Sequence, residues 1–85
     1  MIKYNAQIKI TLRKGILDVQ GKTVEKALHS TEFDMIQNVR IGKFVELMVN
    51  ADNKEKAFDI TREACNKLIA NPIIEDFEIM IEKED

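Results

Sequence analysis

Hydrophobic and polar residues alternate along the first dozen positions of the chain. Residues 2, 4, 6, 8, 10 and 12 are apolar, and the residues between them are polar. Successive side chains of a strand point to opposite faces, so this period of two predicts a half-buried strand over residues 2–12. A second alternating segment, with Phe77, Ile79 and Ile81 on its apolar side, predicts a strand over residues 74–82. The charged tail, Glu82–Asp85, is expected to fray.

Two segments have the spacing of amphipathic helices. The first covers residues 22–31 and follows a loop bounded by glycines. The second covers residues 53–70, and Asp52 followed by Glu55 has the spacing of a capping box at its start. Pro72 ends this helix, because the residue before a proline is driven out of the helical region. The apolar stripe predicted for the second helix is Ala57, Ile60, Ala64 and Leu68, widened by Phe58, Thr61, Cys65 and Ile69.

The segment between the two helices is the most informative. A two-residue hairpin turn at Gly42 and Lys43 would pair Val39 with Glu46 and send the remaining apolar residues to the opposite face. If residues 39–49 form one strand, their apolar residues share a face, interrupted only at Lys43. The pattern therefore favours one long strand with a flexible point at Gly42.

The length of this strand predicts an association of two chains. Eleven strand residues span about 36 Å at about 3.3 Å each, whereas a compact chain of this length is about 30 Å across. Phe44 and Met48 make the second half of the strand apolar on both sides. We therefore predict an α+β, two-layer fold related to ferredoxin-like domains, in the order β-α-long β-α-β, or βαββαβ if the long strand is divided. We expect a homodimer in which this strand bridges two subdomains.

Composition narrows the class of protein. Apolar residues make up 45% of the 85 residues and charged residues 33%, which describes one folded domain over residues 1–85. The net charge of −2 gives no electrostatic reason to bind nucleic acid or an anionic membrane. Cys65 is the only cysteine and His29 the only histidine, so we expect no disulfide and no metal cage. The absence of a signal peptide pattern favours a cytoplasmic protein.

Few residues carry candidate chemistry. The segment from Gly15 to Thr23 resembles a phosphate-binding loop, but it has five residues between its glycines where that motif needs four. Cys65 lies beside the predicted apolar stripe, and no sequence feature supplies it with a base. Three charged residues, Asp18, Arg40 and Lys43, are either solvated or in contact with a partner subunit. No complete active site is expected on this chain.

Three stretches of the chain together resemble one family. LRKGILDVQGKTVEKAL (residues 12–28), VRIGKFVEL (39–47) and NPIIEDFEI (71–79) are similar, in order and spacing, to PurS, the small subunit of phosphoribosylformylglycinamidine (FGAM) synthase. The likeness covers nearly the whole chain. One departure is Val19, where the family often has proline, so the loop loses a restraint on φ.

The resemblance implies a role in de novo purine biosynthesis. In the family, a large synthetase, PurL, binds ATP and formylglycinamide ribonucleotide (FGAR), and a glutaminase, PurQ, releases ammonia. PurS is implied to be a dimeric adaptor through which the two assemble, as a homodimer or a tetramer. ATP and Mg²⁺ are then expected on the large subunit and no cofactor on this chain. The residues expected at a partner interface are Asp18, Gln20, Arg40, Gly42, Lys43, Phe44 and Met48.

A second class of function stays open from the residues alone, namely a small ligand-sensing or RNA-binding α/β module. RNA-binding sheets of this size usually present aromatic residues on an exposed strand face. Tyr4 and Phe77 lie instead on the apolar faces of their predicted strands. The pattern therefore favours the adaptor.

Overall fold

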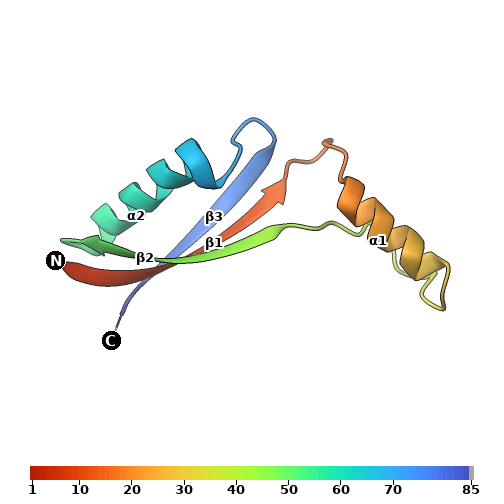
Figure 1. Cartoon of the computed structure of the whole chain (residues 1–85), viewed down its shortest axis with the longest axis horizontal. Helices are drawn as coiled ribbons and strands as arrows, with labels where there is room; N and C mark the ends of the chain where they lie inside the picture. Colours follow the sequence, from red (N-terminus) through yellow and green to blue (C-terminus); the bar gives the residue numbers. More distant parts are fainter. Residues whose placement is uncertain (85) are drawn as a thin grey trace.

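The protein is a three-stranded antiparallel sheet with one helix packed on it and one helix standing away from it (Figure 1). The computed structural model describes residues 1–84. The elements are β1 (Ile2–Leu12), α1 (Val19–His29), β2 (Lys43–Ala51), α2 (Lys54–Ala64), the short π-helix η1 (Cys65–Ile69) and β3 (Glu75–Lys83). The strand order is β2-β1-β3. The predicted α+β class is confirmed.

The central strand follows the predicted alternation. Tyr4, Ala6, Ile8 and Ile10 are buried on one face, and the residues between them are exposed. The neighbouring strands place mostly apolar residues opposite these positions, among them Val45, Leu47, Ile79 and Ile81. β3 begins one residue later than predicted and runs one residue further, into the charged tail. The N–H of Glu84 donates to the carbonyl of Lys3 at 3.0 Å, so the predicted fraying is wrong up to this residue; residue 85 lies outside the described residues.

The middle segment does not reverse direction at Gly42. β2 pairs antiparallel with β1, and residues 39–42 continue from it toward α1 (Figure 1). The strand itself starts only at Lys43, so the prediction of one strand over residues 39–49 is wrong for its first four residues. Among residues 1–84 no ladder pairs residues 39–42 with another strand, although Gly42 lies beside β1. A Cβ on Gly42 would lie 2.6 Å from the carbonyl oxygen of Ile10, so glycine permits the close approach to β1.

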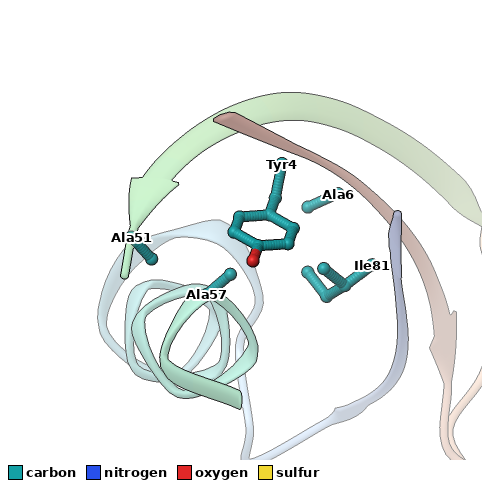
Figure 2. Close-up of a cluster of buried hydrophobic side chains, with 5 residues drawn as sticks. All are labelled: Tyr4, Ala6, Ala51, Ala57 and Ile81. Atoms are coloured by element: carbon teal, nitrogen blue, oxygen red, sulfur yellow. The ribbon is translucent and has the colours of Figure 1, made fainter. Parts of the chain in front are cut away.

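α2 covers one face of the sheet, and the core lies between them. Figure 2 shows one cluster, in which the ring of Tyr4 lies between β1 and Ala57 of α2. The second cluster contains Ile8, Ile10, Cys65 and Ala70. The buried side chains on the helical segment are small, which lets the helix approach the sheet closely.

The apolar stripe predicted for this helix is partly wrong. The helix buries Ala57, Thr61 and Cys65, whereas Ile60 is 48% exposed and Leu68 is 90% exposed. The small residues, spaced four apart, face the sheet, and the larger apolar residues lie to either side of them. The exposed Leu68 lies in the π-turn that follows α2, which is closed by the N–H of Ala70 donating to the carbonyl of Cys65.

The cap of α2 also differs from the predicted capping box. Asn53, rather than Asp52, is the N-cap residue, and its side-chain oxygen accepts a hydrogen bond from the N–H of Lys56 at 2.8 Å.

The molecule is elongated, with principal extents of 52 × 29 × 14 Å. Its radius of gyration is 16.6 Å, whereas a compact chain of this length has about 12 Å. The difference comes from residues 13–42, which we call the arm. Among residues 1–84, α1 packs extensively on neither the sheet nor α2 (Figure 1). The sheet with α2 and η1 is called the body.

Candidate partner-binding site

Asp18 connects the start of α1 with Ile41, near the place where the arm leaves the body. We call the contacts there the arm junction. One carboxylate oxygen accepts from the N–H of Gly21 at 2.8 Å, which caps α1. The other accepts from the N–H of Ile41 at 2.7 Å. α1 therefore starts at Val19, three residues before the predicted start, because Asp18 supplies the cap. The hydrogen bonds from Gly21 and then Ile41 lower the pKa of Asp18 below its ordinary value of 3.8.

Glu25 and Arg40 complete this junction. Glu25 accepts from the N–H of Val39 at 3.0 Å, and the Arg40 guanidinium donates to the carbonyl of Leu12. A Cβ on Gly21 would lie 2.4 Å from the carbonyl oxygen of Val39, so the backbone of α1 is in direct contact with the backbone at Val39. Gly21 lies inside α1, which excludes the phosphate-binding loop considered from the sequence.

Four of the predicted interface residues line one cavity of about 280 Å³ between the arm and the sheet: Asp18, Gln20, Gly42 and Lys43. Lys43 forms an ion pair at 3.4 Å with Glu75, which also lines this cavity. Gln20 is exposed in the first turn of α1. A larger hollow of about 530 Å³ on the arm is lined by Asp18 and Arg40, with Lys14 and Lys22 beside them.

Phe44 and Met48 lie elsewhere, on the sheet face opposite α2. Each is 54% exposed, and Met80 of β3, 52% exposed, shares this face. A hollow of about 370 Å³ between the outer strands is lined by Met48 and Met80 and by polar residues such as Gln7. The predicted interface thus divides into an arm junction and an open sheet face.

Two residues of these surfaces were not predicted from the sequence. Glu25 lies seven residues after Asp18, two helical turns on, so a correct start for α1 would have placed both on one face. Met80 falls between Ile79 and Ile81, on the outward side of β3. The sequence shows that Met80, Met48 and Phe44 each alternate with the inward-facing residues of their strands. It does not show the strand order that brings the three side chains to one face of the sheet.

The arm junction and the open sheet face present backbone N–H donors, apolar side chains and a few positively charged side chains. Cys65 is fully buried, and burial raises the pKa of its thiol. A ring N–H of His29 donates to the carbonyl of Ile36 at 2.6 Å. Among the residues described, 1–84, no three His, Cys, Asp or Glu side chains form a group that could hold a metal ion. Nor does any helix in this range have the length and apolar character of a membrane span. Exposed strand edges and apolar faces of this kind suit the docking of another protein chain.

The fold is that of a small α+β chain. Its unpaired strand edge and exposed apolar faces are typical of a subunit of a larger assembly. Comparison with known proteins identifies the family. A model described as PurS, phosphoribosylformylglycinamidine (FGAM) synthase, matches residues 5–83. The chain belongs to the PurS family of FGAM synthase subunits, as the sequence resemblance predicted.

Characterised relatives agree over nearly their full length. The PurS subunit of Methanocaldococcus jannaschii is 38% identical over 80 residues, which cover 94% of this chain and 96% of the relative. The PurS subunit of Bacillus subtilis is 36% identical over 80 residues, 94% of each chain. The predicted function, a subunit of FGAM synthase in purine biosynthesis, is therefore confirmed.

Solved structures show the same fold. The crystal structure of M. jannaschii PurS, a subunit of formylglycinamide ribonucleotide amidotransferase in the purine biosynthetic pathway, superimposes with a TM-score of 0.85 at 36% identity, covering 96% of this chain and 99% of the other. A chain in the structure of PurLQS from Thermotoga maritima superimposes with a TM-score of 0.86 at 33% identity, covering 96% of this chain and 100% of the other. The alternative of a sensing or RNA-binding module is set aside.

Proposed function

We propose that this chain is the non-catalytic adaptor of an FGAM synthase, acting as a homodimer that brings a PurL-type synthetase and a PurQ-type glutaminase together. The observation that supports the proposal is the arm, whose helix α1 is formed but does not pack extensively on the body. Assembly with both partners is supported by the PurLQS structure of the T. maritima relative, which this chain matches along 96% of its length.

The free edge of β2 is where a second copy would pair. β2 bonds to β1 on one side only, so its other edge, here called the outer edge, has no partner strand among residues 1–84. An exposed strand edge is a template for pairing with another chain. Residues 39–42 extend this edge beyond the body. Two copies related by a twofold axis would lay these segments beside each other's β2.

The same exchange accounts for the exposed arm. A ferredoxin-like unit has four strands and two helices, whereas the body supplies three strands and α2. Residues 39–42 and α1 of a second copy would supply the fourth strand and the second helix. Leu17 and Val19, 68% and 66% exposed at the start of α1, would then be covered. Each subdomain is completed by the other chain.

The chemistry of the complex lies on its other subunits in this proposal. The synthetase binds ATP, Mg²⁺ and FGAR, and the glutaminase releases ammonia from glutamine, in the cytoplasm. Ammonia is lost to bulk water unless the two active sites are held in register. A rigid dimer supplies two docking surfaces, and we assign the open sheet face with Phe44 and Met48 to one of the partners.

The test is reconstitution from purified synthetase, glutaminase and this chain. We expect glutamine-dependent formation of FGAM to require the chain, whereas formation from added ammonium salt should proceed with the synthetase alone. Equal glutamine-dependent rates with and without the chain would contradict the adaptor role.

A double variant, Phe44→Ser with Met48→Ser, tests the open sheet face. It should weaken co-elution with the partner enzymes while the homodimer stays intact. Leu68→Ser, at an apolar side chain that is 90% exposed on η1, is the matched control. Unchanged co-elution of the double variant would remove the open face from the interface.

A further inference from the structure

We propose that Asp18 and Glu25 are positioning residues that decide which edge of residues 39–42 is available to a second copy. They take the place of a neighbouring strand on the edge that faces α1, here called the inner edge. The outer edge alone then remains to pair. This inference rests on the homodimer proposed above and assigns the residues that direct its formation.

The two carboxylates act like the acceptors of a strand ladder. Val39 and Ile41 lie two residues apart, so in extended chain their N–H groups point to the same edge. Glu25 accepts from the first at 3.0 Å and Asp18 from the second at 2.7 Å. Hydrogen bonds to ionised acceptors are stronger than neutral ones. The inner edge is therefore closed by side chains of the same chain.

The opposite edge is left open by the same geometry. The N–H groups of Arg40 and Gly42 alternate with those of Val39 and Ile41 and point away from α1. Within residues 1–84 neither N–H has a backbone or side-chain acceptor. They extend the unpaired edge of β2 by two donors. A second copy therefore meets one continuous edge with a fixed register.

Close packing of α1 at Gly21 against Val39 keeps the inner edge inaccessible to another strand. A Cβ on Gly21 would lie 2.4 Å from the carbonyl oxygen of Val39 and 2.6 Å from a carboxylate oxygen of Asp18. Only a glycine lets α1 come near enough for both carboxylates to reach the strand. The arm is thus set before a partner arrives, which lowers the ordering cost of association.

Asp18→Ser separates positioning from helix capping. Serine is a good N-cap, so the bond to Gly21 can be kept, but its side chain is too short to reach Ile41 as well. Glu25→Ala removes the second acceptor without touching the cap. Glu32→Ala, an exposed acid of the arm outside the junction, is the control. Sedimentation over a concentration series gives the dimer dissociation constant, and amide hydrogen exchange by NMR reports each N–H.

We expect Asp18→Ser and Glu25→Ala each to raise the dissociation constant about tenfold, the scale of one lost charge-assisted hydrogen bond. The amides of Ile41 and Val39, respectively, should lose protection. The amide of Ile8 should stay protected in both variants, because the body remains folded. In the wild type, Arg40 and Gly42 should be protected only at concentrations where the dimer forms.

Wild-type affinity in both variants, or rapid exchange of Ile41 in the wild type, would overturn the inference while the homodimer stands. A wild-type chain that stays monomeric at every concentration would overturn the homodimer and the inference together. The two failures are therefore distinguishable.

Discussion

The body and the arm are stabilised by different forces. In the body, β1 and α2 bury apolar side chains against each other, with Ile8 and Ala57 fully inaccessible to solvent. In the arm, residues 13–42, the elements are held mainly by hydrogen bonds between side chains and backbone: Asp18 and Glu25 accept them, and Arg40 donates. The body buries a core of its own, whereas the arm leaves its apolar side chains exposed.

Exposure shows this difference most clearly. No hydrophobic residue of the arm is among the buried hydrophobic residues of the described chain, 1–84. Seven of the fifteen exposed large hydrophobic residues lie in the arm: Ile16, Leu17, Val19, Val24, Phe33, Met35 and Ile36. Burial of apolar surface is the main driving force of folding. A segment that forgoes it within the chain is expected to recover it in an assembly.

The largest expected effect is in the body. Ile8→Ala should lower the free energy of unfolding by about 2–5 kcal/mol, because it leaves a cavity in a fully packed site. Urea denaturation, measured at a concentration where the chain is monomeric, gives this value. Val24→Ala in the arm, where the side chain is 37% exposed, is the matched comparison and should change the monomer little. Equal losses at the two sites would contradict the contrast between body and arm.

Gly21→Ala should separate the arm from the body. Helix propensity alone would favour alanine by about 1 kcal/mol. The Cβ would, however, lie 2.4 Å from the carbonyl oxygen of Val39, so the strand segment has to move away. We expect weaker dimerisation in sedimentation experiments with unchanged amide shifts in the body. Lys26→Ala, an exposed change in the same helix, is the control; a Gly21→Ala dimer as tight as the control would refute this account of the contact.

Acid should loosen the arm before the core. Hydrogen bonds from Gly21 and Ile41 to the carboxylate lower the pKa of Asp18 below 3.8 in the folded chain. The lowered value means that Asp18 stabilises the junction fully above about pH 3.8 and loses this effect as the pH falls through the folded pKa. NMR titration of the Ile41 amide should show no transition from pH 7 to 4 and one below. A transition near neutral pH would assign the change to another group.

The smallest expected effect is on the exposed face of the helices. Glu63 and Lys67 form an ion pair at 2.8 Å, with both side chains mostly exposed, which lowers the pKa of Glu63. Exposed pairs contribute little to stability because water and salt screen them. Glu63→Gln should leave the denaturation midpoint unchanged within error at 0.15 M salt. A shift as large as that of Ile8→Ala would show that the pair is part of the core.

The parts of the fold that depend on one chain were predictable from its sequence. The alternation of β1 and β3 gave both strands within about one residue, since their burial is decided by the sheet of this chain. Residues 39–42 carry the same alternation, but they pair with no strand among residues 1–84, and β2 starts at Lys43. Alternation along a strand predicts which side chains share a face of the sheet. It does not say which chain supplies the neighbouring strand.

The candidate site was predictable in part for the same reason. Asp18, Arg40 and Gly42 stood out because charged residues and glycine interrupt an apolar pattern, and the structure brings them to one junction. The role of Glu25 was hidden, since its acceptor function depends on a backbone N–H fourteen residues away. Long-range contacts to backbone leave no mark in residue type.

The central claim is that the outer edge of residues 40–50 pairs with a second copy of this chain. An isotope-filtered NOE experiment on a mixture of labelled and unlabelled chains observes such contacts directly, because only pairs in different copies give signals. The account predicts intermolecular NOEs among the backbone protons of residues 40–50. A sample of 9.8 kDa monomers, or intermolecular NOEs confined to other surfaces, would contradict it.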